Sequence, residues 1–120
     1  MPNPEQNLAL VQASAMRAGF ARAGTLALPG LAGERAFADW LDRGWAGGMS
    51  YLRRHAPARL APHQLVPGSR SVICLAASCG GGGPGPIARY ARGRDYHKVL
   101  KKRCRALMDL LRAARPEFDG

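Results

Sequence analysis

The stretch SRSVICLAAS, residues 69–78, decides the fold class of this chain. Its middle is β-branched and continuously apolar, which is typical of a strand that is covered on both faces. Such strands belong mainly to parallel sheets, in which crossover helices lie on both sides of the sheet. The sequence therefore predicts an α/β fold built around this strand.

Downstream of the strand, CGGGGPGP at residues 79–86 predicts a mobile surface loop, because adjacent glycines are costly to order and proline lacks a donor. Phosphate binding is the alternative, since glycine amides after a strand can approach a ligand closely. The loop lacks the Lys-Ser/Thr ending of a P-loop, and no helix starts directly after the glycines. The surface loop is therefore the favoured interpretation.

The C-terminal part predicts a long helix. Residues 87–91, IARYA, suit a short strand or an extended approach, after which Asp95 can cap a helix that runs to about Ala114. The sequence RP at 115–116 ends it. Apolar residues recur along this helix at steps of four, four, three and four, which predicts one face packed on the core: Tyr96, Leu100, Cys104, Leu107 and Leu111.

Upstream of the strand, helical spacing of apolar residues predicts a helix over residues 6–22, followed by a short buried strand in TLALP, 25–29. A second helix lies within 33–48, with Phe37, Trp40 and Leu41 on one face and a tight glycine exit. Residues 56–70 contain three prolines and predict an irregular connection with one short turn around 63–66.

This order of elements is the start of an α/β arrangement with a parallel sheet. Two or three strands rarely make an independent sheet, and the sequence ends just after a helix, where another strand is expected. Residues 1–120 are therefore expected to be a truncated N-terminal portion of a domain.

The chain carries a net charge of +10, with fifteen Arg and three Lys, which favours polyanionic partners over anionic membranes. Residues 56–120 hold twelve basic and four acidic side chains, so the C-terminal half is the candidate polyanion surface. Tyr90 and Tyr96 are interleaved as stacking groups. A solvated face is the alternative to an RNA-binding set of Arg89, Arg92, Arg94, Lys98, Lys101, Lys102 and Arg105.

Other chemistry is weakly indicated. Asp95 with His97 could form an acid–base pair, but capping is favoured, since side chains two apart on a helix do not face each other. His55 and His63 have no Cys or carboxylate partner at ligand spacing. No metal site is predicted from Cys74, Cys79 and Cys104, which are expected to be small buried hydrophobes. The start lacks a signal peptide and no apolar run could span a membrane, so a cytoplasmic protein is expected.

Three stretches, GWAGGMSYLRRH, ARLAPHQLVPGSRSVICLA and IARYARGRDYHKVLKKR, together resemble the N-terminal part of epoxyqueuosine reductase in order and spacing. The resemblance runs from about residue 8 to residue 114. It implies a cobalamin-binding domain similar to that of reductive dehalogenases, followed by a module with two [4Fe-4S] clusters and helical repeats. The implied reaction reduces epoxyqueuosine to queuosine at the tRNA wobble position, in a monomeric enzyme supplied by an external electron donor.

The resemblance also carries two cobalamin-contacting positions to Arg59 and Ala88. The family's proton-donating Asp lies in a segment beyond Gly120, and Asp119 in EFDG does not match it; the cluster cysteines are also absent. No catalytic residue is therefore assigned, and the fragment itself is expected to be inactive. A non-catalytic basic RNA-binding module is the alternative function, and a corrinoid-trafficking or dehalogenating protein a third.

Overall fold

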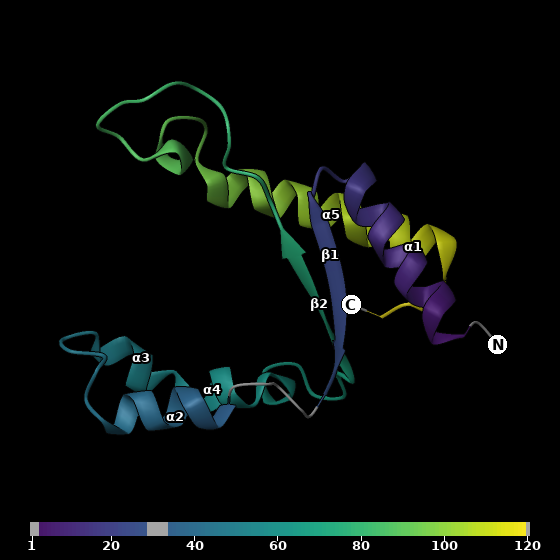
Figure 1. Ribbon diagram of the computed structural model, residues 1–120. Helices are drawn as coiled ribbons and strands as arrows, with labels where there is room; N and C mark the ends of the chain where they lie inside the picture. The colour runs from purple at the N-terminus through teal and green to yellow at the C-terminus, as the bar shows by residue number, and fades with distance from the viewer. Residues whose placement is uncertain (1–2, 29–33, 120) are drawn as a thin grey trace. The chain divides into compact units, whose positions relative to one another are not determined.

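The structure is a computed structural model that describes residues 3–28 and 34–119. The chain divides into two compact units. The first comprises Met1–Thr25 with Ile73–Gly120, and the second comprises Leu26–Val72. Figure 1 shows the elements of each unit. Along the described parts of the chain, no helix is both long and apolar enough to cross a bilayer.

The first helix, α1, spans Pro4–Arg17 rather than the predicted 6–22. Asn3 and Gln6 start it with a reciprocal capping box, in which the Gln6 N–H donates to Asn3 Oδ1 at 2.8 Å. Gly19, with φ of 99°, ends it in a Schellman motif: the N–H of Phe20 donates to the Ala15 carbonyl. The predicted end at residue 22 is too late, because the helix ends before Gly19, and Phe20 belongs to the core although it lies outside the helix.

The long helix α5 spans Tyr96–Ala114, with the bounds and the Asp95 N-cap that the sequence predicts. It packs against α1. The core of the first unit is formed where they meet, and Leu107 and Leu111 supply the apolar face of α5. Tyr96 and Cys104, predicted on the same face, are exposed. The α1 side and the adjoining turn contribute the remaining apolar core residues, Val11, Ala15 and Phe20.

Strands β1, Arg22–Ala27, and β2, Ser71–Ala76, pair side by side (Figure 1). Ala21 N–H donates to the Ala76 carbonyl at 2.8 Å, and Leu28 N–H donates to the Arg70 carbonyl at 2.9 Å. Residue numbers rise along one strand as they fall along the other, so the pair is antiparallel. The predicted parallel pairing through crossovers is wrong, because the chain returns alongside β1 in the opposite direction.

β2 also differs from the expectation of a strand covered on both faces. None of its residues is buried; Ile73 and Leu75, two apart and thus on one face, pack against the core of the first unit. β1 begins three residues earlier than predicted, and Pro29, the predicted end, lies outside the described residues. The fold class is a mixture of helices and a small antiparallel sheet.

The second unit contains short helices. α2 spans Glu34–Asp42, α3 Ser50–Arg54, α4 Ala56–Leu60 and the 3₁₀ helix η1 Pro62–Gln64. As predicted, α2 carries an apolar face: Leu41 is buried, and the rings of Phe37 and Trp40 stack with centroids 6.2 Å apart. The Arg53 guanidinium donates to the Leu41 carbonyl at 2.6 Å and so satisfies the end of α2.

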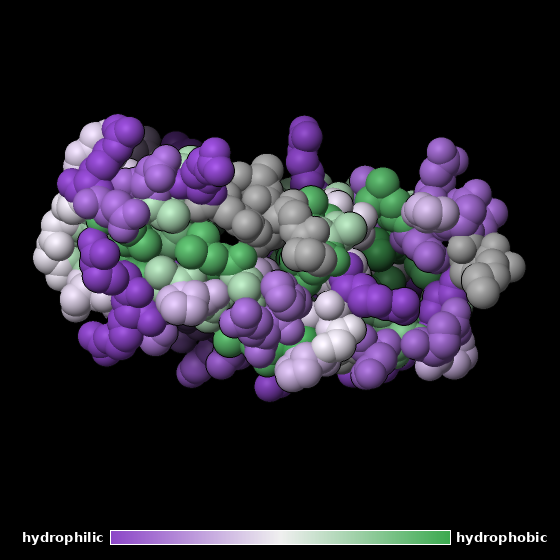
Figure 2. Space-filling model, turned by 90° about the horizontal axis from the view of Figure 1, so that it is seen from below, coloured by the Kyte–Doolittle hydropathy of each residue, from purple (hydrophilic) through white to green (hydrophobic). Residues whose placement is uncertain are grey.

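The proline-rich connection is more regular than predicted. Pro57 and Pro62 each occupy the first turn of a short helix, where a missing N–H costs nothing, so prolines start α4 and η1 instead of preventing them. Figure 2 shows hydrophobic side chains, in green, reaching the surface between hydrophilic ones on the face in view. Large side chains more than 60% exposed include Trp45, Leu65 and Val66 of this unit.

Candidate nucleic-acid interface

The predicted RNA-binding cations all lie in the first unit and are all exposed. Arg89 lies on η2, the 3₁₀ helix Arg89–Ala91, where the sequence had suggested a strand or extended segment. Arg92 and Arg94 follow it in the approach to α5. The helix itself carries the others, Lys98, Lys101, Lys102 and Arg105. We call these seven exposed cations together the basic face.

The helix geometry explains why these cations gather. Lys98, Lys101, Lys102 and Arg105 are three or four residues apart and therefore lie on one side of α5. Leu107 and Leu111 take the opposite side and are buried against α1. The core thus fixes which side of the helix presents positive charge to solvent. In this arrangement the surface can contact a run of phosphates.

Arg92 differs from the other members of the basic face. Its Nε donates to the Ile87 carbonyl at 2.6 Å, and its two terminal nitrogens donate to the carbonyls of Gly83 at 2.5 Å and Gly85 at 3.3 Å. The guanidinium therefore ties together the loop that follows β2. This role has no signal in the sequence, because the composition of the loop predicts only that it is irregular.

Asp95 caps α5, as predicted: its Oδ1 accepts from the backbone N–H of His97 at 3.0 Å. The same Oδ1 lies 3.0 Å from Nδ1 of the His97 ring. The expectation that these side chains do not face each other is wrong, because Asp95 lies just outside the helix, where helical spacing does not apply. The hydrogen bond from the His97 ring, followed by that from its backbone, lowers the pKa of Asp95.

Aromatic rings lie beside these cations. The rings of Tyr96 and His97 stack with centroids 4.0 Å apart, and Tyr90 meets Tyr96 edge to face at 5.8 Å. Tyr90 and Tyr96 were predicted as stacking groups from their place among the cations. His97 was missed as part of the stack, since neighbouring helical residues do not ordinarily bring their rings together.

The two positions carried over for cobalamin lie in different units. Arg59 is exposed on α4, and Ala88 is exposed immediately before η2. Ala88 has an extended backbone and accepts a hydrogen bond from Ala91 N–H at 2.9 Å. Both are open to a large ligand. Neither comes with a geometry that identifies the ligand.

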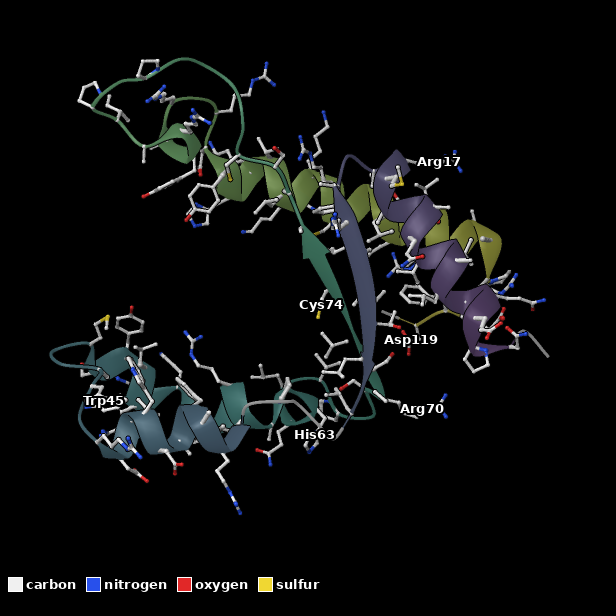
Figure 3. All side chains as sticks on the ribbon, in the orientation of Figure 1. Arg17, Trp45, His63, Arg70, Cys74 and Asp119 are labelled. Carbon is white, nitrogen blue, oxygen red and sulfur yellow. The ribbon has the colours of Figure 1, made fainter. Side chains whose placement is uncertain are left out.

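The cysteines do not form a site. Cys74, Cys79 and Cys104 are exposed free thiols, so the expectation that they are buried is wrong. Cys74 is labelled on β2 in Figure 3. Cys74 lies on the face of β2 opposite Ile73 and Leu75, the two residues that pack against the core. Over residues 3–28 and 34–119, no group of three or more His, Cys, Asp or Glu could hold a metal ion.

Comparison with known proteins supplies the family. The family model described as "Epoxyqueuosine reductase QueG, DUF1730" matches residues 59–120. An epoxyqueuosine reductase of Gloeobacter violaceus is 45% identical over 106 residues, covering 83% of this chain and 32% of the relative. One of Xanthomonas campestris is 31% identical over 124 residues, covering 93% and 35%. No solved structure matches.

The chain spans about a third of the length of these two curated relatives. The match to the family model extends over β2, the glycine loop, η2 and α5, and so includes the whole basic face. The chain therefore belongs to the epoxyqueuosine reductase family.

Proposed function

We propose that this chain is the N-terminal part of an enzyme that reduces epoxyqueuosine to queuosine in tRNA. The observation that carries the proposal is the family match over residues 59–120, supported by curated relatives named epoxyqueuosine reductase. The basic face gives the chain a way to hold a polyanion, and tRNA is the polyanion that contains this nucleoside. The reaction is a reduction, so the enzyme is an oxidoreductase, and we place it in the cytoplasm with its tRNA.

In this proposal the basic face contacts phosphates of the tRNA anticodon arm. The exposed side chains of Lys98, Lys101 and Lys102 extend from α5, and those of Arg89 and Arg94 extend from the segment before it. Arg92 contributes differently, because three of its donors already hold loop carbonyls. Its remaining N–H groups are available to a phosphate.

Cobalamin is the cofactor that we propose for the whole enzyme, within a domain like that of reductive dehalogenases. Each position supports the proposal within its own unit: Arg59 is an exposed forked donor suited to corrin amides or phosphate, and Ala88 is small and accessible. When bound, cobalamin supplies the nucleophilic, redox-active cobalt. The residues of this chain would hold and orient the corrin.

The described residues do not fit an iron–sulfur cluster, since no metal-holding group is found among them and the three thiols do not gather. We therefore assign the two [4Fe-4S] clusters, the proton-donating Asp and the contact with an external electron donor to parts of the enzyme outside residues 1–120. This chain would contribute RNA and corrin binding, and it would be inactive alone.

Turnover tests the proposal. The protein that the gene encodes, supplied with cobalamin, iron–sulfur clusters and a reductant, should convert epoxyqueuosine in tRNA to queuosine, measured by mass spectrometry of nucleosides. The double variant Lys101→Gln/Lys102→Gln should bind tRNA more weakly and lower the log–log salt slope by about 1.5, or about 0.7 to 0.9 per lost phosphate contact. Arg35→Gln/Arg54→Gln, at exposed sites on α2 and α3, is the control for the loss of two charges.

A non-catalytic basic RNA-binding module is the second candidate, favoured by the gathering of all the predicted RNA-binding cations, each exposed, in the first unit. It predicts salt-sensitive tRNA binding without turnover by the gene's whole product. Turnover would exclude it. An affinity for tRNA that does not change with salt would exclude both RNA-binding readings.

A further inference from the structure

Three aromatic rings, Tyr90, Tyr96 and His97, form a cluster at the start of α5. Tyr96 and His97 are stacked with an interplanar angle of 28°, and Tyr90 meets Tyr96 at 84°. The rings contact one another but remain open: Tyr90 is 57% exposed, Tyr96 42%, and the His97 side chain 68%. None of them belongs to the core. Tyrosine, with an apolar ring and a polar hydroxyl, is enriched at interfaces.

The His97 ring is held in place from two directions. Tyr96 covers one face at a centroid distance of 4.0 Å, and Asp95 Oδ1 lies 3.0 Å from Nδ1. Because so much of the side chain is exposed, its other face is accessible to a ligand. A ring that is already fixed loses little conformational freedom when a flat partner stacks on it. The cluster is thus preorganised for stacking.

The charges around the cluster restrict the partner. Arg89 directly precedes Tyr90, Arg94 lies between Tyr90 and Tyr96, and Lys98 directly follows His97. Asp95 is the only acid between residues 87 and 107. A suitable partner combines negative charge with flat aromatic surface. Nucleotides supply both, whereas an anionic bilayer supplies charge alone. In a duplex the base faces are covered by their neighbours, so the bases that can stack here are unpaired ones.

We propose that the aromatic cluster is a stacking platform for an unpaired nucleobase, with His97 and Tyr90 offering ring faces and the neighbouring cations contacting the flanking phosphates. This deepens the proposed function and rests on it, because it states which part of a tRNA this surface takes: loop nucleotides rather than a stem. The basic face alone makes no such distinction.

The test compares two RNAs of equal charge, an anticodon stem–loop and a blunt duplex with the same number of phosphates. Binding of each to the protein that the gene encodes is measured by fluorescence anisotropy. Tyr90→Leu and His97→Leu should each weaken stem–loop binding about tenfold, leave duplex binding unchanged and leave the salt slope of the stem–loop unchanged. Tyr90→Phe and His97→Phe retain a ring and should retain affinity. Tyr51→Leu, which removes a tyrosine 48% exposed outside the cluster, is the matched control.

Equal loss for both RNAs, or no loss for either Leu variant, would overturn the platform. Ring-dependent binding to phosphatidylserine vesicles with unchanged stem–loop affinity would also overturn it and would identify a membrane-binding surface instead.

The stacking platform and the proposed reductase function can each fail without the other. Ring-dependent stem–loop binding without epoxyqueuosine turnover would refute the proposed function and leave the platform standing, and turnover with ring-independent binding would do the reverse. Circular dichroism checks that each variant is folded.

Discussion

The carboxylate of Asp95 contacts His97 twice: Oδ1 accepts the backbone N–H of His97 and lies 3.0 Å from its ring nitrogen Nδ1. One oxygen thus accepts a hydrogen bond from a backbone N–H that has no partner within the helix, and it also orients the His97 ring. The same carboxylate thus links the stability of α5 to the orientation of a ring in the proposed platform. Substitutions of Asp95 should separate the capping interaction from the charge interaction.

Replacing Asp95 with Ala should lower the thermal unfolding midpoint by several degrees, because the first turn of α5 loses its cap. Asp95→Asn should retain most of the midpoint, since an amide oxygen can accept the same backbone hydrogen bond. Thermal unfolding followed by circular dichroism at neutral pH measures both. Equal loss in the two variants would show that charge, not capping, is what Asp95 contributes.

The same residue predicts a pH dependence. The His97 ring, the His97 backbone N–H and the charge of Lys101 lower the pKa of Asp95 below its ordinary value of 3.8. The folded state therefore favours the carboxylate. The midpoint advantage of the wild type over Asp95→Asn should be complete above pH 3.8 and disappear as the pH falls through the folded pKa. His97→Gln should move the Asp95 pKa, followed by carboxyl NMR, back towards 3.8.

Local signals were strong enough to predict α5. An Asp cap, an apolar repeat at helical spacing and a terminating RP all lie within its own residues, so no distant contact was needed. The end of α1 also has a local signal, Gly19, but the apolar repeat continues to Phe20 and hides it. Periodicity identifies which residues face the core without showing whether they still belong to the helix.

The direction of β2 has no local signal. An apolar run of this length favours burial on both faces without fixing the direction of the partner strand, and the pairing depends on the path of the residues between the strands. The exposure of Cys74, Cys79 and Cys104 likewise has no local signal, because burial depends on which elements cover a surface. Long-range pairing thus decided the direction of the strands, which the sequence-based expectation had wrong.

In the candidate interface, composition and helical spacing predicted the cations and two of the rings. They did not predict the contacts made before the helix begins, where the backbone is irregular. The contact of Arg92 with the glycine loop and the contact of Asp95 with the His97 ring both depend on that irregular backbone. The contacts that position the loop and the His97 ring were thus less predictable than the identity of the exposed cations.

Arg92→Lys should loosen the glycine loop without changing the net charge. A lysine ammonium cannot reproduce the fork that joins the carbonyls of Gly83, Gly85 and Ile87. Hydrogen–deuterium exchange of peptides covering residues 79–91 should rise severalfold, with no change in α1. Arg94→Lys, at an exposed position nearby, is the control and should leave exchange in the loop unchanged. Similar increases in exchange for the two variants would show that the Arg92 fork does not hold the loop together.

Gly19→Ala should destabilise the first unit by about 1 to 2 kcal/mol. The position has φ of 99°, which an L side chain rarely adopts, and an added Cβ would lie 3.0 Å from Nε of Arg103 on α5. The side chain of Arg103 can shift away, so most of the cost comes from the backbone. Gly24→Ala in β1 is the matched control, because a Cβ there meets nothing within 4 Å. Urea unfolding followed by circular dichroism measures the difference. A Gly19→Ala protein as stable as the Gly24→Ala protein would show that the Schellman turn does not require glycine, and that α1 ends at Arg17 for another reason.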